Sequence, residues 1–338
     1  MDHEVMLEVQ GLTTTFQSNH QSFHAVDGIS FQIRRGETLG VVGESGCGKS
    51  VTSLSIMGLI KHPGKVSHGQ IKFKGTNLLS MSNKQLRQIR GNQISMIFQE
   101  PMTSLNPVYT IGNQIGEALS VHTKMNKKQI RERTIELLQM VGIPRMEEII
   151  KAHPHQLSGG MRQRVMIAMA MACKPELLIA DEPTTALDVT IQAQILELMR
   201  ELQQANGMSM MLISHDLGVV SEVCDRVIVM YAGRIVEQGP VRDILDRPQH
   251  PYTRGLLASL PKHAKGERRL HFIPGQVPPP SQWGKGCRFA GRCASVMERC
   301  HHEIPPLIDN GAPNQAACWL IEKGGDSLDA QRNEIGIS

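Results

Sequence analysis

The chain has 338 residues, of which 40% are hydrophobic and 20% are charged. This balance excludes an intrinsically disordered chain, and the length exceeds the roughly 250 residues that one compact core usually holds. The 36 Lys and Arg against 32 Asp and Glu leave a net charge of +4 without a basic tail, so nucleic-acid binding has no support in the composition.

The N-terminus carries Asp2 and Glu4 where a secretory signal would carry positive charge. The longest apolar run, which begins at Val165, is shorter than the roughly 18 residues of a transmembrane helix. We therefore expect a cytosolic chain that does not itself cross a membrane. In a reducing cytosol, clustered cysteines are more often metal ligands than disulfides.

Apolar residues alternate along residues 7–16 and 25–33, which predicts two paired strands of an antiparallel sheet. Helical stretches, such as 131–142 and 191–204, separate the later apolar runs. Those runs are typical of strands buried in a parallel sheet and cover residues 37–45, 94–98, 176–181 and 208–215. The order predicts an α/β fold with helices on both faces of a parallel sheet.

A glycine-rich loop, GESGCGKS, follows the first of these buried runs and precedes a helix. It matches G-x-x-x-x-G-K-[ST], in which backbone N–H groups surround a phosphate, the lysine reaches the β- and γ-phosphates and the final hydroxyl ligates Mg²⁺. We expect nucleotide contacts from every residue of the loop and from the next one: Gly43, Glu44, Ser45, Gly46, Cys47, Gly48, Lys49, Ser50 and Val51.

Two acidic residues, Asp181 and Glu182, stand at the end of the run 176–181. Ionised carboxylates at the end of a buried strand are costly unless they serve a cation or a reaction. Asp181 suits water-mediated Mg²⁺ binding, and Glu182 suits the base that polarises an attacking water. The alternative is an acidic pair that caps the next helix.

The sequence LSGGMRQ precedes the apolar helix that includes Val165. Ser158 and the N–H groups of Gly159 and Gly160 therefore lie at a helix N-terminus and form a second candidate anion site. Taken alone, this is an ordinary helix cap.

The phosphate loop, LSGG, ADEPTTALD and ISHD occur in an order that resembles the nucleotide-binding subunit of ATP-binding cassette (ABC) transporters. The resemblance implies an ATPase with a parallel-sheet core, an antiparallel β subdomain and a helical subdomain. It implies that Ser158, Gly159 and Gly160 contact ATP held by a partner subunit. Met161 stands where the family usually has glutamine, a departure also found in its peptide-importer branch.

The same resemblance gives roles to further residues. Gln99 resembles the residue that approaches Mg²⁺ and links the site to the membrane subunit, and His215 resembles the switch histidine that touches the γ-phosphate. Asp188 matches the loop that joins the two subunits. Phe16 resembles the aromatic that stacks on adenine, with Phe23 as a weaker candidate. Residues 100–119 resemble the groove that receives a permease helix.

Four of the seven cysteines follow the spacing C-x₅-C-x₆-C-x₁₇-C: Cys287, Cys293, Cys300 and Cys318. Four thiolates suffice for zinc or a [4Fe–4S] cluster, and His301 or His302 could replace one of them. The alternative is a tail with unligated cysteines. Together with HPYTRGLLASLP, the cysteines resemble the C-terminal extension of dipeptide and oligopeptide importer ATPases, which favours iron–sulfur. We expect them to hold together a loop-rich tail of low apolar content.

We therefore expect an ATPase domain at residues 1–245, with its helical subdomain at about 100–165, and an extension at 246–338 that carries the four cysteines. The implied partners are a second ABC ATPase, either a paralogue or the same chain, two transmembrane permeases and an extracytoplasmic solute-binding protein. The expected location is the cytoplasmic face of the cell membrane.

Several alternatives stay open at this point. The cargo could be a peptide, nickel, a metallophore or a sugar, since none of the motifs would touch it. The chain could instead be a soluble ABC ATPase that acts on nucleic acid or ribosomes, although such proteins more often carry two cassettes per chain. A third alternative is a metal-responsive module in which ATP binding alone is the signal.

Overall fold

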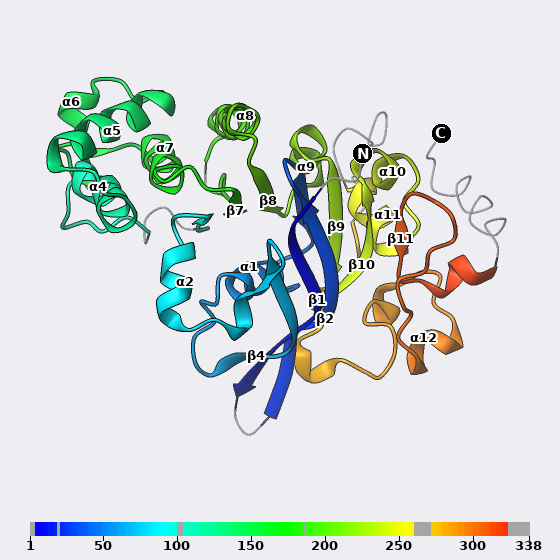
Figure 1. Cartoon of the computed structure of the whole chain (residues 1–338). Coiled ribbons are helices and arrows are strands. Elements are labelled where there is room, and N and C mark those ends of the chain that lie inside the picture. Colours follow the sequence, from blue (N-terminus) through cyan, green and yellow to red (C-terminus); the bar gives the residue numbers. More distant parts are fainter. Residues whose placement is uncertain (1–3, 19–20, 100–103, 186, 260–271, 324–338) are drawn as a thin grey trace.

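The computed structural model describes residues 4–18, 21–99, 104–185, 187–259 and 272–323 (Figure 1). A seven-stranded sheet has the order β11-β10-β9-β3-β8-β7-β6, and a four-stranded sheet has the order β2-β1-β4-β5. The larger sheet comprises β3 (Thr38–Val42), β6 (Ile94–Ile97), β7 (Leu177–Asp181), β8 (Ser209–Ser214), β9 (Arg226–Tyr231), β10 (Arg234–Pro240) and β11 (Gln315–Ala316).

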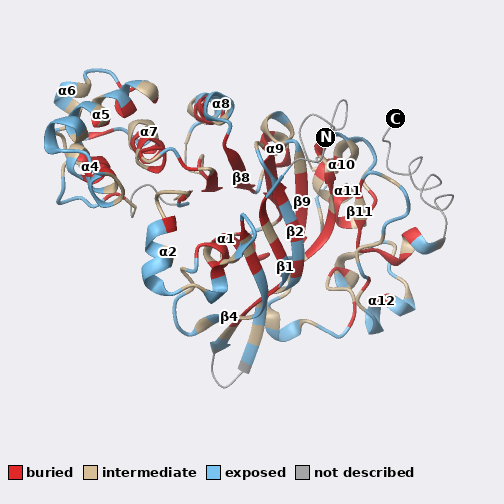
Figure 2. Ribbon diagram, in the orientation of Figure 1, coloured by how far each residue is buried: buried red, intermediate tan, exposed pale blue. Residues whose placement is uncertain are grey.

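Five neighbouring strands of the larger sheet, β6, β7, β8, β3 and β9, run parallel. Alternate side chains of β7 enter two different cores: Leu178 and Ala180 one, Leu177 and Ile179 the other. Burial on both faces explains the continuous apolar runs, and the predicted parallel sheet is confirmed. Figure 2 shows the buried residues gathered along these strands.

The two faces of the parallel sheet are covered differently. Helix α7 (Gly159–Ala170) and helix α8 (Val189–Asn206) pack in the core of one face. On the other face, α1 (Lys49–Ile56) shares its core with the four-stranded sheet. The sequence predicted helices on both faces of the sheet. The second face does carry the helix α1, but the four-stranded sheet covers most of it.

The four-stranded sheet is antiparallel, as the alternation predicts. Its strands are β1 (Val5–Ser18), β2 (Gln21–Arg34), β4 (Gly64–Phe73) and β5 (Thr76–Asn77). The β1–β2 hairpin is longer than the alternating segments, because pairing continues through Phe16↔Phe23 to Ser18↔Gln21.

A helical arm projects from the sheet at the end of β6 (Figure 1). It consists of α4 (Ile111–His122), α5 (Lys127–Met140), α6 (Met146–Ile149) and α7. Buried residues such as Ile115, Leu137 and Val165 join its helices into the core of the first face. A further helix, α2 (Asn83–Ile89), precedes β6, and α9 (Leu217–Val223) precedes β9.

The C-terminal extension contains α10 (Val241–Asp246), α11 (Pro251–Ala258) and α12 (Glu298–His302). Its strand β11 pairs with β10, which makes the extension part of the main sheet. The buried Glu237 carboxylate accepts hydrogen bonds from the N–H groups of Gln249 and His250 and from the Asn314 side chain, at 2.7, 3.0 and 2.8 Å. The extension is thus attached to the sheet by backbone pairing and by a buried hydrogen-bond network.

Burial contributes to holding the extension in place, in addition to any role of its cysteines. The rings of Tyr231, Tyr252 and Phe289 meet at centroid distances of 4.7 to 5.4 Å, and all three side chains are buried. Aromatic pairs of this kind stabilise a fold beyond their area alone. Among the helices of the described ranges, none combines the length and apolar character that a bilayer crossing needs.

Candidate functional site

The phosphate loop joins the end of β3 to the start of α1, as predicted. Gly43, Gly46 and Gly48 have φ values of 151°, 79° and 102°, which other residues rarely adopt. A Cβ atom at Gly43 would lie 2.2 Å from the Met230 carbonyl oxygen. Only glycine fits there, so the loop is shaped by sterics before any ligand binds.

Lys49 is the first residue of α1, and its side chain is 4% exposed. Its ammonium group donates hydrogen bonds to the carbonyl oxygens of Gly43 (2.7 Å) and Glu44 (3.2 Å). It also lies 3.8 Å from Oε1 of Glu182. The loop backbone therefore holds a positive charge beside the ring of N–H groups that would receive phosphates.

Ser50 and Asp181 lie side by side beneath the loop. Ser50 Oγ donates to Asp181 Oδ1 at 3.0 Å, and Ser53 Oγ lies 3.4 Å from Oδ2. Burial raises the pKa of Asp181 above its ordinary value, while the Ser50 hydrogen bond partly opposes that shift. A hydroxyl and a carboxylate in contact are hard oxygen donors, and this donor set fits Mg²⁺.

Glu182 brings together residues from four segments of the chain. Its Oε2 accepts hydrogen bonds from Gln99 Nε2 (3.1 Å) and Thr185 Oγ1 (3.0 Å), and His215 Nδ1 lies 3.4 Å away. Its φ of 48° is in the left-handed region, a strained conformation for a residue with a side chain. The turn after β7 thus aims this carboxylate at the three predicted residues Lys49, Gln99 and His215.

Thr185 was missed by the sequence interpretation. Its hydroxyl fixes the Glu182 carboxylate, and its position three residues beyond that acid was the available signal. Tyr252 and Arg292, which also contact the phosphate loop, were missed as well, and no motif marks Arg292.

The LSGG segment lies away from the phosphate loop of the same chain. Ser158 caps α7 and accepts a hydrogen bond from the Met161 N–H at 3.3 Å. Gly160 approaches Ile191 on α8, which Asp188 caps. Figure 1 shows α7 well separated from α1. Within one chain, the helix that Ser158 caps and that begins at Gly159 therefore lies apart from the helix that follows the phosphate loop.

Phe16 and Phe23 stack on each other near the end of the β1–β2 hairpin, with ring centroids 5.9 Å apart. Gly64 of β4 lies against the Phe16 ring, because a Cβ added there would be 2.5 Å from it. Both rings are partly exposed, so either presents an aromatic surface. The part of residues 100–119 that spans 100–103 lies outside the described residues.

The four cysteines of the extension line one small cavity together with His250 and Trp319. None forms a disulfide. Burial raises the pKa of Cys287 to about 11 and that of Cys318 to about 12, so both are neutral thiols in the metal-free protein. Across the described ranges, no group of three or more His, Cys, Asp or Glu side chains has the arrangement of a metal site. The described residues therefore do not show a metal site, although the four thiols of the prediction lie around one cavity.

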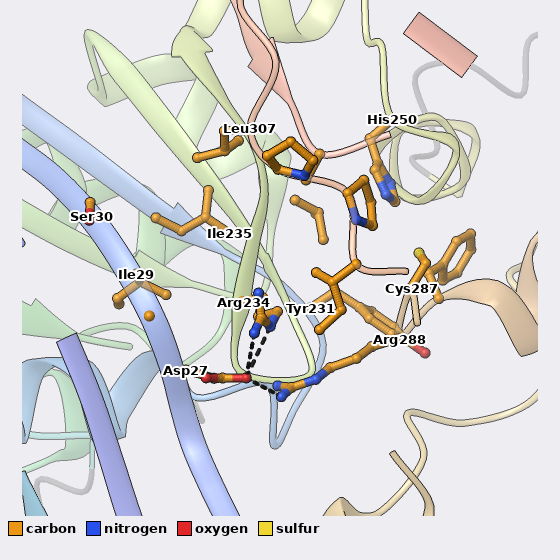
Figure 3. A pocket seen from close by; sticks show the side chains of 17 residues that line it. Asp27, Ile29, Ser30, Tyr231, Arg234, Ile235, His250, Cys287, Arg288 and Leu307 are labelled. Atoms are coloured by element: carbon orange, nitrogen blue, oxygen red, sulfur yellow. Dashed lines mark hydrogen bonds and ion pairs between the residues drawn. The ribbon is translucent and has the colours of Figure 1, made fainter. Parts of the chain in front are cut away.

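A larger cavity of about 220 Å³ lies at the seam between the extension and the sheets. At its edge, Asp27 pairs with Arg234 of β10 and with Arg288 of the extension (Figure 3). Ile29, Ile235 and Leu307 line its apolar part.

Comparison with known proteins adds two family matches. Residues 26–185 match the family described as ABC transporter, and residues 236–300 match the oligopeptide/dipeptide transporter C-terminal region. The chain is 54% identical to the oligopeptide transport ATP-binding protein AppD of Bacillus subtilis, across 95% of this chain and 98% of AppD. It is 55% identical to the dipeptide transport ATP-binding protein DppD of Haemophilus influenzae, across 96% and 99% of the two chains.

Solved structures agree on the fold of the ATPase part. The dimeric ATP-binding cassette MJ0796, in a post-hydrolysis state bound to ADP and Pi, matches with a TM-score of 0.64 at 28% identity, over 70% of this chain and 99% of that one. The protein cbiO1 of Clostridium perfringens matches with a TM-score of 0.61 at 30% identity, over 72% and 92%. Subunits of this kind are ATPases coupled to transport. The chain belongs to the ATP-binding subunits of ABC transporters, in the group that carries the oligopeptide/dipeptide transporter C-terminal region.

Proposed function

We propose that the chain is the ATP-hydrolysing subunit of an importer for dipeptides or oligopeptides at the cytoplasmic face of the cell membrane. The observation that carries the proposal is the surroundings of the Glu182 carboxylate. Gln99, Thr185 and His215 contact one of its oxygens, and the Lys49 ammonium group lies 3.8 Å from the other. The names of AppD and DppD support peptides as the cargo. They lend no support to a soluble ATPase that acts on nucleic acid or ribosomes.

In the proposed reaction, the phosphate loop binds the β- and γ-phosphates of ATP, and Lys49 offsets their negative charge. Ser50 would give Mg²⁺ a direct oxygen ligand. Asp181 would bind the ion through water, and Gln99 would approach it. Bound Mg²⁺ would neutralise the charge that develops on the phosphate oxygens. Glu182 orients the attacking water and accepts its proton.

His215 would contact the γ-phosphate and so respond to its presence. Its ring is 64% exposed and lies against Glu182, so it can turn toward a ligand without unpacking the core. Phe16 would stack on the adenine ring. The remaining contacts would come from the loop residues Glu44, Ser45, Gly46, Cys47, Gly48 and Val51.

The second half of each site would come from another subunit. Ser158, Gly159 and Gly160 lie apart from their own phosphate loop, so they would contact ATP across a head-to-tail dimer. Asp188 would join the two subunits, and its neighbour Val189 is 84% exposed, as an interface residue would be in the separate chain. ATP would close the dimer, and hydrolysis with product release would reopen it.

The proposed partners are a second ABC ATPase, more often a paralogue in this branch, two permeases and an extracytoplasmic solute-binding protein. Val108 and Tyr109, at the base of the helical arm, are 75% and 54% exposed. Exposed apolar side chains in this place suit a permease helix as the occupant. We also propose the division into residues 1–245, with the helical subdomain near 100–165, and 246–338.

The test is to isolate the tagged chain from detergent-solubilised membranes and identify its companions by mass spectrometry. We expect two multi-span permeases and a second cassette ATPase. Proteoliposomes that hold this complex should then accumulate labelled dipeptide in an ATP-dependent manner when the binding protein is added. Uptake of nickel or a sugar in place of dipeptide would contradict the cargo, and recovery of ribosomal partners alone would contradict import.

For the extension, we propose a [4Fe–4S] cluster on Cys287, Cys293, Cys300 and Cys318, with Zn²⁺ as the alternative. Its support is that all four thiols line one cavity. The Cys287 N–H also donates to the Cys300 carbonyl at 2.8 Å, which ties two of the loops together. A thiolate-bound metal would displace the thiol protons that burial now favours.

Anaerobically purified protein should contain about four iron and four sulfide per chain and absorb visible light. Cys300→Ser should lose this iron, whereas Cys173→Ser, outside the cluster, should keep it. Stoichiometric zinc without iron would contradict the [4Fe–4S] cluster and support Zn²⁺ at the same cysteines. If the wild-type chain contained neither iron nor zinc, the proposed metal site would be overturned.

A further inference from the structure

The C-terminal extension reaches the phosphate loop through one side chain, Arg292. Its guanidinium group lies 2.9 and 3.1 Å from the two carboxylate oxygens of Glu44, the second residue of the loop. The arginine is 9% exposed, and the glutamate is 27% exposed. This pair joins residues 248 positions apart in the chain.

The arginine is itself rigidly held. Carbonyl oxygens of the segment 273–275 accept from its remaining N–H groups: Pro274 at 2.9 Å, Gly275 at 3.2 Å and Ile273 at 3.3 Å. A guanidinium group with fixed partners loses little further freedom when it binds a carboxylate. Arg292 therefore acts as a fixed support for the loop rather than as a mobile surface charge.

A second group of the extension holds the same loop residue. The Glu44 N–H donates to the buried Tyr252 hydroxyl at 3.0 Å. Both the backbone and the side chain of Glu44 are thus positioned by residues of the extension. The Glu44 carbonyl oxygen, in turn, accepts from the Lys49 ammonium group at 3.2 Å. The position of Lys49 consequently depends on a residue that the extension fixes.

A second set of contacts reaches the loop at Cys47. Arg288 donates to the Ala232 carbonyl. It also pairs with Asp27 (Figure 3). The Asp27 N–H donates to the Gly233 carbonyl, and the Gly233 N–H donates to the Cys47 carbonyl of the phosphate loop, both at 2.9 Å. Arg292 therefore contacts the loop directly, whereas Arg288 is connected to it only through Asp27 and Gly233.

We infer that Arg292 is a positioning residue of the ATP site, which acts on Lys49 through Glu44. It has two effects. It fixes the loop before ATP arrives, and it neutralises a carboxylate that would otherwise repel the triphosphate. The inference goes beyond the proposed function and rests only on the ATP site, not on the cargo or on a metal in the extension.

The experiment measures ATP affinity of the full chain by calorimetry, with ATPase rates in the assembled transporter. Arg292→Ala should raise the Kd and KM for Mg-ATP about tenfold and leave kcat within about twofold of wild type, because Arg292 contacts no reacting atom. Arg292→Lys keeps the charge but loses the N–H groups that the carbonyl oxygens of residues 273–275 hold, so its Kd should lie between those of wild type and Arg292→Ala. Lys285→Ala removes an exposed positive charge of the same extension and should leave the Kd, KM and kcat for Mg-ATP at their wild-type values.

A double variant separates positioning from general damage to the extension. Glu44→Gln added to Arg292→Ala removes the unpaired carboxylate and should recover a large part of the lost affinity. Affinity within twofold of wild type in Arg292→Ala would overturn the inference. Lost affinity that Glu44→Gln fails to recover would overturn it too, since the effect would then not pass through Glu44. A wild-type chain that binds no ATP would instead refute the ATP site itself.

Discussion

Glu182→Gln is expected to lower the ATP hydrolysis rate about 10³-fold while ATP remains bound. The amide oxygen can still accept from Gln99 and Thr185, so the turn after β7 should keep its shape. What is lost is a carboxylate able to take the proton of water, a contribution of about 10²- to 10⁴-fold in general-base catalysis. ATP should hold the dimer closed, because the step that reopens it no longer occurs.

The measurement is steady-state ATPase activity of the assembled transporter, with ATP affinity determined in parallel. Glu176→Gln is the matched control, since this glutamate directly precedes the same strand and pairs at the surface with Lys74 at 2.9 Å. Its rate should equal that of wild type. A Glu182→Gln variant that hydrolyses ATP at the wild-type rate would refute the role of Glu182 as the base.

The second large effect is expected from Ser158→Arg. Ser158 lies at the N-terminus of α7, away from its own phosphate loop, and its hydroxyl only caps that helix. An arginine there should leave ATP affinity of the separate chain within about twofold of wild type. In the transporter it should lower ATPase activity at least about 10²-fold, because a bulky cation replaces a small group at the surface that closes over ATP.

Calorimetry on the separate chain and ATPase assays on the transporter distinguish these two effects. Ser80→Arg places the same side chain at an exposed position of the four-stranded-sheet region and should alter neither quantity. If Ser158→Arg weakened ATP binding in the separate chain, the LSGG segment would have to act on its own phosphate loop. That result would contradict a site shared between subunits.

The chemistry of the site and the strands of the parallel sheet follow from local sequence. The positive φ values at Gly43, Gly46 and Gly48 admit few other residues, so a glycine loop between a strand and a helix can be identified as a phosphate loop from the sequence. Continuous apolar runs mark strands covered on both faces, and β6, β7 and β8 form as those runs predict. Asp181 and Glu182 could be identified because ionised carboxylates at the end of a buried strand are costly unless they bind a cation or take part in a reaction.

Only the tertiary structure shows how these pieces meet. Gln99 and His215 converge on Glu182 because they follow β6 and β8, which flank β7 in the sheet, and the spacing along the chain does not encode that order. The extension is a further case, since its strand β11 pairs with β10. That pairing and the buried aromatic rings bring Arg292 to Glu44. Sequence determines which residues can do the chemistry, whereas long-range packing, which depends on every contact in the core, decides which of them touch.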